Sequence, residues 1–598
     1  MPTLVPRHFR THQAIQFVES FSETVPTQYY FYIGKTYPYA NTIQITGTVK
    51  TNPTSNNIVG TGTLFTTELS VGDRLGITDQ SNIVVVHSIP NAQTIVVTPR
   101  PSEANTTGAN AYIRKTWSEQ YPPDPVDDFQ TIYYDIWRNI ISLKRVTQTD
   151  VTHVMARYNW TSNTVYSEYD DLDSAIHSKQ YYVYTDNNNV YKCIDNNRNS
   201  ASTVKPTGTS TGIIGPLADG YRWKFIYNIS SGEVLKYRTA NYIPVKTLTA
   251  NDASSQWLVQ STASNGAISH IKVLANGSNY MYSTNLFADV TSTTKMKLQP
   301  SANGVDGTYV GSALYISEGD AATQIRKIVK YWGANNTLIV NSAFTTLPTT
   351  SSRYIISPLV TIRGDSGGTE ASRASAYVSN AYAGQIRRIR MIEPGYSYST
   401  ANVTISANHG FGGVARPIIP PIGGHGKDPV SEFEATAVMA SVTVTGSESN
   451  TFTTNNDFRI IGLMRDPVLA NGTIATASVI DQTTRINIEL GTGDWIEDEI
   501  VIGSQSQAKG RVVYFANTNA ARTEGIVKLT RVTRNGTGGN FRAGEIITGL
   551  TSSVTANVVS VTPPALKPYS GLIIYTENRE PVYRDPVQAE NYKFVVSY

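Results

Sequence analysis

One short segment gathers acidic side chains and a histidine. Glu168, Asp170, Asp171 and Asp173 lie close together, and His177 follows them. Carboxylates grouped in this way serve as general acids and bases or hold a cation. The spacing departs from an EF-hand loop, which requires alternating acids, a central glycine and a distal glutamate. The alternative is a helix start, in which Asp170, Asp171 or Asp173 caps a short helix. We favour this alternative because acids in a first turn suit the helix dipole.

Two histidines flank a glycine-rich loop. His409 precedes it, His425 lies at its end, and Lys427 and Asp428 follow. Such a loop can bind a metal through the histidines or a phosphate through its backbone amides. No third ligand lies nearby in the sequence, and the Gly-Lys-Ser/Thr ending of a P-loop is missing. We therefore expect the glycines to form tight turns.

The remaining reactive residues form no catalytic pattern. Cys193 is the only cysteine, lies in an apparent strand, and is expected to be a buried structural thiol. The tyrosine rings of the segments 29–32 and 181–184 could stack on sugar rings, as in an adhesin. We favour the interpretation that they pack inside sheets or at contacts between subunits. The sequence thus predicts no catalytic residue, no cofactor and no metal site, and we interpret the chain as non-enzymatic.

The composition favours a large, mostly β protein. The 598 residues exceed what one compact core usually holds, so several domains or large insertions are expected. The 36 tyrosines and many threonines favour strands, while glycine and asparagine mark turns. A net charge of +3 is too weak to indicate nucleic-acid binding. We expect no membrane span, because no long apolar run is present, and no signal peptide.

Few helices are expected. Ile15, Phe17, Val18 and Phe21 crowd one face of a predicted helix at 8–22. An aromatic strand follows at 29–33 and ends at Gly34. A second helix is predicted at 128–145. The proline- and glycine-rich stretch 417–426 indicates a boundary.

A hairpin pattern occurs twice. Residues 83–87 and 94–97 predict one hairpin, and residues 325–330 and 337–340 predict another. Each follows a Gly-Asp pair, Gly72–Asp73 and Gly319–Asp320, and each ends in a further strand, at 111–113 and 354–356.

Two further repeats are present. In the sharper one, seven residues recur at a constant offset, and we interpret the copies as two small β units side by side. The first copy contains Trp495, Glu499, Ile500, Gly503, Ser506, Val512 and Val513, and the second contains Phe541, Glu545, Ile546, Gly549, Ser552, Val558 and Val559. The other repeat matches 271–277 with 389–395, and Tyr280–Thr284 with Tyr396–Thr400.

Four separated blocks resemble the baseplate wedge subunit encoded by gene 8 of T-even-like phages. The first runs from Phe9 to the Tyr37–Pro38 turn, and the second from Pro122 to about Val245. The third is Asp457–Gly462 with Asp466–Pro467, and the fourth runs from Gly571 to Pro581 and ends in a strand at 594–596. The blocks cover less than half of the chain, and the T-even protein is much shorter. The excess falls at about 43–116, 251–426 and 471–565, where the repeats lie, so we interpret these segments as insertions into scaffold loops.

The resemblance implies a β-sandwich core with a few helices on loops, to which the insertions add small β modules. The expected core segments are 1–42, 117–250, 427–470 and 566–598. The resemblance also implies a structural protein of the tail baseplate, assembled in the host cytoplasm. It would form a homodimer within each wedge, hold other wedge proteins together, and take part in the rearrangement that triggers sheath contraction. Candidate interface residues are Trp137, Trp223, Tyr575, Asn578 and Arg579. The alternative is a host-binding tail fibre or spike, with or without carbohydrate-degrading activity.

Overall fold

The computed structural model describes residues 5–36, 43–78, 80, 84–113, 129–365, 373–533 and 540–598. The predicted Tyr37–Pro38 turn, the start of the second block at Pro122, and the predicted boundary after residue 116 lie outside these residues. Strands make up 44% of the structure and helices 9%, which confirms the predicted fold class, mainly β with few helices. No helix in the described ranges is long and apolar enough to cross a membrane.

The chain forms two compact units. Unit 1 comprises Met1–Val18, Thr152–Met439 and Val595–Tyr598, and unit 2 comprises Glu19–Val151 and Ala440–Phe594. The boundaries between them, at 18/19, 151/152, 439/440 and 594/595, fall inside all four of the expected core segments.

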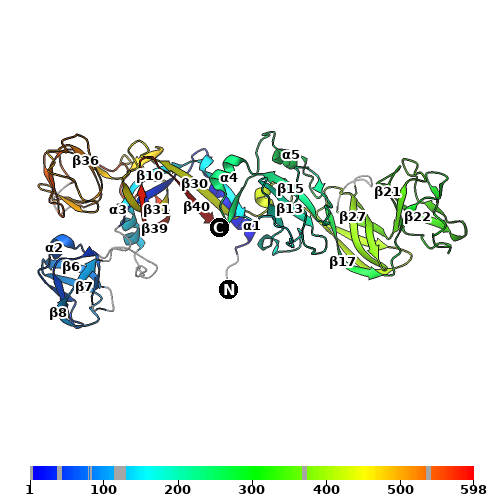
Figure 1. Ribbon diagram of the computed structural model, residues 1–598, viewed down its shortest axis with the longest axis horizontal. Helices are drawn as coiled ribbons and strands as arrows, with labels where there is room; N and C mark the ends of the chain where they lie inside the picture. The colour runs from blue at the N-terminus through cyan, green and yellow to red at the C-terminus, as the bar shows by residue number, and fades with distance from the viewer. Residues whose placement is uncertain are drawn as a thin grey trace. The chain divides into compact units, whose positions relative to one another are not determined.

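A sheet built from distant segments forms the core of unit 2 (Figure 1). Its strands are, in spatial order, β32 (Val479–Asp481), β10 (Ile140–Val146), β1 (Tyr29–Gly34), β31 (Asn456–Arg465) and β39 (Leu572–Arg584). Every residue of β1 is buried, as expected of a central strand whose side chains pack on both faces. The predicted aromatic strand is therefore confirmed.

One face of this sheet packs on a helix and the other on a second sheet. Trp137 of α3 (Phe129–Asn139) belongs to the same buried cluster as Tyr30 and Tyr32. On the opposite face the Phe31 ring stacks 4.5 Å from that of Tyr592 in β40 (Ala589–Ser597). The neighbour of β40 is β30 (Ala437–Thr445). This arrangement is a β-sandwich.

Both predicted long helices exist, but their ends differ from the prediction. The first, α1 (Arg7–Glu19), is shorter than 8–22. The second ends at Asn139, and β10 begins at the next residue, so a helix through residue 145 is wrong. Pairing of β10 with β1 overrides the local helical pattern, because it buries Ile140, Ile141 and Leu143 in the sheet.

Residues 43–113 form a separate module with its own buried core. Its helix is α2 (Phe65–Glu68), and the predicted hairpin is confirmed as β6 paired with β7. The strands are, in spatial order, β2 (Ile43–Gln44), β9 (Ala111–Ile113), β5 (Arg74–Ile77), β6 (Val84–Asn91), β7 (Thr94–Thr98), β4 (Asn57–Thr61), β3 (Thr48–Thr51) and β8 (Asn105–Ala109).

Residues 283–357 form a module of the same topology, again with its own core. The strands are, in spatial order, β18 (Ser283–Leu286), β24 (Arg353–Ser357), β21 (Ala313–Glu318), β22 (Ile325–Trp332), β23 (Thr337–Val340), β20 (Lys295–Lys297) and β19 (Asp289–Val290). The order β24-β21-β22-β23-β20-β19 matches β9-β5-β6-β7-β4-β3, which confirms the hairpin repeat. The Gly-Asp pairs are not equivalent, because Gly72–Asp73 precedes β5 whereas Gly319–Asp320 joins β21 to β22.

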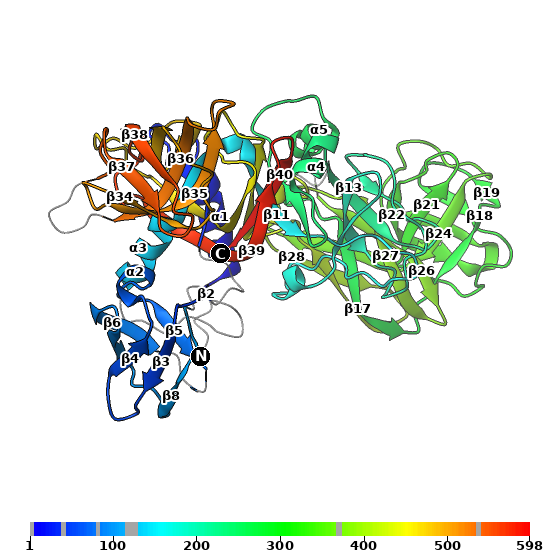
Figure 2. The same ribbon diagram turned by 60° about the vertical axis from the view of Figure 1, so that its left-hand side comes forward.

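The sharper repeat forms one closed barrel rather than two units side by side (Figure 2). Its strands are, in order around the barrel, β33 (Thr484–Glu489), β36 (Gly525–Thr533), β35 (Lys509–Asn517), β34 (Ile500–Gly503), β37 (Ile546–Gly549) and β38 (Thr555–Thr562). The two copies meet where β34 pairs with β37, with Gly503 opposite Ile547 and Val501 opposite Gly549. Side chains from both copies share one core.

The repeated polar residues of the barrel bind across the two copies. The Glu545 carboxylate accepts hydrogen bonds from the Ser506 backbone amide and hydroxyl, each at 2.9 Å. Reciprocally, Glu499 accepts bonds from the amide and hydroxyl of Ser552, each at 3.0 Å. A side chain at Gly503 would place its Cβ 2.6 Å from Glu545 Oε2, which explains the repeated glycine.

The third repeat marks two strand ends in unit 1. The strands concerned are β17 (His270–Ser278) and β27 (Gln385–Glu393). After each strand a tyrosine folds back, so that Tyr280 Oη accepts a bond from the Gly413 amide and Tyr398 Oη from the Ala374 amide. The structure therefore equates Tyr280 with Tyr398, and the predicted match to Tyr396 is wrong. The antiparallel strands around them are β25 (Leu359–Gly364) with β28 (Ala401–Ser406), β26 (Ser375–Tyr382) with β27, and β17 with β29 (Phe411–Ile418).

The remaining part of unit 1 frames the pocket described below. One sheet contains, in order, β12 (Tyr182–Tyr184), β13 (Asn189–Asp195), β15 (Arg222–Asn228) and β14 (Ile213–Ile214). Beside it β11 (Val151–Ala156) pairs with β16 (Tyr242–Val245). The short helices are α4 (Ser231–Tyr237), α5 (Ser255–Thr262) and α6 (Pro429–Glu432). α4 carries a capping box between Ser230 and Glu233, a sequence signal that the helix prediction had missed.

Candidate functional site

The acidic segment does not begin a helix. Its only regular element among the described residues is a 3₁₀ turn at Ile176–Ser178. The N-cap position of this turn is Ala175, so no aspartate side chain caps it. Asp170 Oδ1 instead accepts a bond from the Leu172 amide, and Asp173 Oδ1 one from the Ala175 amide, both at 3.0 Å. These are local turns of a kind that aspartate favours. The helix-start interpretation is therefore wrong.

Basic residues neutralise most of this segment. Asp170 and Asp171 both bind the Arg416 guanidinium, and Lys272 Nζ lies 3.1 Å from Asp170 Oδ2. Burial by itself would raise the pKa of Asp170, but the Leu172 amide, Lys272 and Arg416 lower that pKa overall. Asp173 forms a separate ion pair with Lys179 at 2.5 Å. The predicted cluster is thus divided among several cations.

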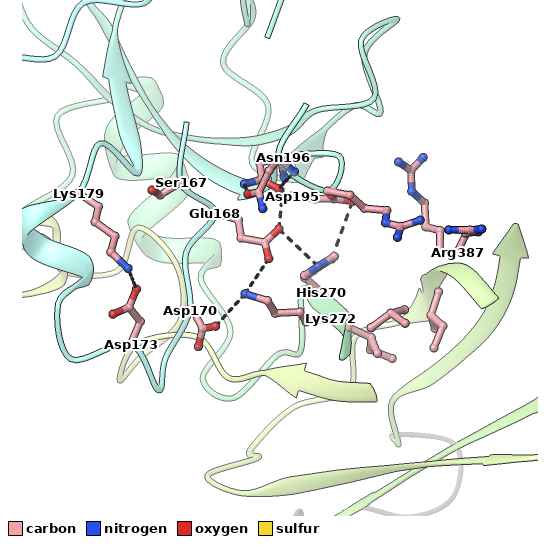
Figure 3. A pocket seen from close by; sticks show the side chains of 16 residues that line it. Ser167, Glu168, Asp170, Asp173, Lys179, Asp195, Asn196, His270, Lys272 and Arg387 are labelled. Carbon is pink, nitrogen blue, oxygen red and sulfur yellow. Dashed lines mark hydrogen bonds and ion pairs between the residues drawn. The ribbon is translucent and has the colours of Figure 1, made fainter. Parts of the chain in front are cut away.

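A different set of side chains lines a pocket of about 420 Å³. Figure 3 shows Glu168 and Asp195 on either side of His270, with Lys272 and Arg387 nearby. His270 Nε2 lies 4.0 Å from Glu168 Oε2, and His270 Nδ1 lies 3.9 Å from Asp195 Oδ2. One ligand atom from each of the three lies within 4.8 Å of the others, which is close enough for a shared cation.

Three distant segments position these side chains. Asp195 is the last residue of β13, next to a shift in register opposite β15, and such bulges commonly re-aim a side chain. His270 is the first residue of β17, and burial lowers the pKa of its imidazole. Glu168 comes from the acidic segment. Sequence reasoning found Glu168 but missed Asp195 and His270, because no local spacing connects the three.

The loop histidine His425 lies in a buried polar network. Its Nε2 is 3.1 Å from Ser269 Oγ, and its Nδ1 is 3.3 Å from Glu432 Oε1, which is the connectivity of a serine–histidine–acid triad. Lys192 Nζ donates to Glu432 Oε1 at 2.7 Å and lies 3.3 Å from the centre of the Tyr169 ring. Every one of these side chains is buried or nearly so.

The electrostatics of this network favour a structural role. Burial and then the adjacent Lys192 lower the pKa of His425 to about 4, so its neutral imidazole is a weak base. Burial opposes ionisation of Glu432, but Lys192 and His425 lower the pKa of that carboxyl to about 2. None of Ser269, His425 and Glu432 lines the pocket. The network links β13, the loop before α6, and the start of β17.

The other predicted residues lie where packing places them. Gly423, Gly424 and Gly426 all have positive φ, as expected for tight turns, and His409 is exposed. Cys193 is fully buried, and burial raises the pKa of its thiol.

The candidate interface residues separate into two groups. Trp137 and Trp223 are buried in the cores of their own units, at 4% and 0% exposure. Tyr575, Asn578 and Arg579 lie on β39, the last strand of the unit 2 sheet. Tyr575 is 42% exposed, so this strand retains surface for a partner whereas the tryptophans do not.

Comparisons with known proteins give no relative from which to infer a function. No family model matches the chain, and no curated protein matches it significantly.

Proposed function

We propose that the chain is a non-enzymatic structural subunit of the baseplate wedge of a contractile phage tail. It holds neighbouring wedge proteins together and takes part in baseplate assembly and in the rearrangement that triggers sheath contraction. The observation that supports this proposal is the assembly of the four blocks that resemble the gene 8 wedge subunit. They supply β1, β10, β31 and β39, which are adjacent strands of one sheet although each is more than a hundred residues along the chain from its neighbour in the sheet.

The modules at 43–113, 283–357 and 484–562 are compatible with this scaffold because each enters and leaves through paired strands. Ile43 pairs with Ile113, Ser283 with Ile356, and Arg485 with Thr562. Paired residues of antiparallel strands lie only about 4.5–5.5 Å apart, so a module with such ends fits into a loop without displacing the strands around it. A scaffold can carry additions of this kind on its surface.

The edge strand β39 is the proposed contact for partners. Leu572, Ile574 and Tyr575 are 47%, 42% and 42% exposed, an apolar stretch on a strand that ends its sheet. Edge strands of this kind pair readily with another chain unless charge or covering blocks them. We assign β39, including Tyr575, Asn578 and Arg579, to the homodimer contact within a wedge.

The first test is the oligomeric state of the purified chain by light scattering after size exclusion. The wild type should be a dimer. Ile574→Lys should shift the equilibrium toward monomer, because the substitution buries a lysine in the contact, close to the same lysine of the second chain. Leu64→Lys is the matched control, since Leu64 is 48% exposed on the separate 43–113 module. A wild type that stays monomeric at high concentration would contradict the dimer.

The second test is the location of the chain in the virion. Cryo-electron microscopy of the tail of the encoding phage should place the unit 2 sheet in the baseplate. Density in the distal fibres would instead favour the alternative, a host-binding fibre or spike. The polar 420 Å³ pocket is the observation that favours this alternative. A glycan array and a depolymerase assay test it, and selective binding or cleavage would replace the baseplate proposal.

A further inference from the structure

The pocket in unit 1 holds a histidine that its surroundings leave unsatisfied. The His270 side chain is 8% exposed, and its Nδ1 has no hydrogen-bond partner among the described residues. The nearest carboxylate oxygens lie at 3.9 and 4.0 Å, beyond hydrogen-bonding distance. Leaving a buried nitrogen without a partner is energetically unfavourable, so this arrangement points to a missing ligand.

Both neighbouring carboxylates are held by hydrogen bonds or ion pairs, and one oxygen of each faces His270. Glu168 Oε1 binds Lys272 Nζ at 3.0 Å, while Oε2 accepts a bond from the Asn196 amide at 3.4 Å and faces the imidazole. Asp195 Oδ1 accepts a bond from the Asn197 amide at 2.9 Å, while Oδ2 faces the imidazole. Metal ligands are commonly held by outer bonds of this kind, which orient the oxygen that binds the ion.

We propose that Glu168, Asp195 and His270 bind one divalent transition-metal ion of the Zn²⁺ or Mn²⁺ type. One imidazole nitrogen and two carboxylate oxygens suit these ions better than Ca²⁺, which prefers oxygen ligands throughout. Ligands of a tetrahedral zinc site lie about 3.3 Å apart, given bonds of about 2.0–2.1 Å. The 3.9 Å and 4.0 Å separations involve opposite nitrogens of the imidazole, and one ion binds only one of them. With a single nitrogen as ligand, the three ligand atoms lie within 4.8 Å of one another, so they move together by up to about 1.5 Å when the ion binds.

The remaining coordination positions face the pocket. Its wall includes Arg387 and Arg388 of β27, and Lys179 lies on the same pocket. Glu168, Asp195 and His270 line the same pocket. The ion is therefore accessible from solvent, unlike a closed structural zinc site.

Isothermal titration of the untagged, chelator-treated full chain with ZnCl₂ and with MnCl₂ tests the proposal. One ion should bind per chain, with micromolar or tighter affinity for zinc. His270→Gln and Asp195→Asn should each weaken binding at least about tenfold. Asp173→Asn and His409→Gln are the controls, because Asp173 lines the same pocket outside the three ligands and His409 is an exposed histidine. Absence of zinc binding, or equal binding by His270→Gln and the wild type, would overturn the proposal.

A second measurement needs no variant and so does not depend on how a variant folds. Pulsed electron paramagnetic resonance of the Mn²⁺-loaded wild type should show coupling to one imidazole nitrogen. A spectrum that shows oxygen ligands alone would rule out the site. His270 would then be a protonated imidazole that interacts with the carboxylates of Glu168 and Asp195 and binds no ion.

Discussion

The barrel at 484–562 and the two hairpin modules are all built from repeats, but their copies relate to each other differently. The hairpin copies at 43–113 and 283–357 lie in different units, and each packs its own core. The barrel copies share a core, and β34 of one copy pairs with β37 of the other. A repeat in the sequence therefore does not show by itself whether a copy folds alone.

Buried repeated polar residues distinguish the two cases. Glu499 and Glu545 are 4% and 0% exposed, and each takes hydrogen bonds from the serine of the other copy. A buried carboxylate is costly unless it is paired or hydrogen-bonded. A barrel copy cannot satisfy its own glutamate in this way, whereas the hairpin repeat has an apolar core that each copy completes by itself.

Deleting one copy should give the largest difference between the two kinds of repeat. Removal of 541–562 should unfold the rest of the barrel, because Glu499 loses its donors Thr551 and Ser552, and β33 and β34 each lose one of their two neighbouring strands. Removal of 43–113, closed by two glycines, should leave the remaining chain folded, including the 283–357 module. Limited proteolysis with peptide mapping measures both. Continued protection of 484–533 after the first deletion would show that one barrel copy is self-sufficient.

Removal of the whole barrel is the companion experiment. Excision of 484–562 should be tolerated with a short glycine bridge, because Arg485 and Thr562 are paired. The wider excision of 471–565 should be harmful, because it also deletes β32 and the buried Ala475 of the core sheet.

A single substitution should break the link between the barrel copies. In Glu545→Gln the new side-chain NH₂ group replaces one carboxylate oxygen. It cannot accept the hydrogen bonds that backbone amides such as those of Gln505 and Ser506 donate to this oxygen. We expect a loss of about 3 kcal/mol in the unfolding free energy of the barrel. Urea unfolding followed by pulse proteolysis measures it. Glu524→Gln, at an exposed position of the same barrel, should have little effect. Equal effects of the two variants would show that the Glu545–Ser506 hydrogen bonds do not hold the two copies together.

Mild acid should sharpen the comparison between the units. Burial, with a minor opposing effect of Asp428, lowers the pKa of His153 to about 4, and burial also lowers the pKa values of His177 and His425 to about 4. These three imidazoles therefore bind a proton less readily in the folded state than in the unfolded state. Their contribution to the unfolding free energy of unit 1 is complete above pH 6.5 and is lost as the pH falls toward 4. His87, the histidine of unit 2, is exposed.

Urea midpoints at pH 7.5 and pH 5.0, resolved by peptide mapping, check this expectation. The midpoint of unit 1 should fall at pH 5.0, where most carboxylates remain ionised, and that of the barrel should change less. A barrel that loses stability as steeply as unit 1 would show that histidine burial is not the cause.

The smallest expected effect separates two neighbouring tyrosines. Tyr398→Phe removes the acceptor of the buried Ala374 amide and should cost about 1–2 kcal/mol. Tyr396→Phe should be nearly neutral, because Tyr396 is 47% exposed. Thermal unfolding of unit 1 measures both. The reverse order would restore the match of Tyr280 with Tyr396.

Local patterns in the sequence predicted the elements with short-range causes. The aromatic run at 29–33, the hairpin of β6 and β7, and the turn glycines at 423–426 follow from side-chain shape and backbone freedom. The repeated Glu and Ser positions of the barrel were also visible. Their offset alone carried no information on which serine each glutamate would bind.

Only the tertiary structure decided the end of the second helix and the composition of the pocket. Residues 140–145 became a strand because β1 offered a buried neighbour, a long-range gain that outweighed local propensity. Glu168, Asp195 and His270 meet because β13 ends and β17 begins at the same pocket, although about a hundred residues separate Glu168 from His270. Periodicity and spacing report on neighbours along the chain, whereas the environment of a buried charge is set by strands that pair across it.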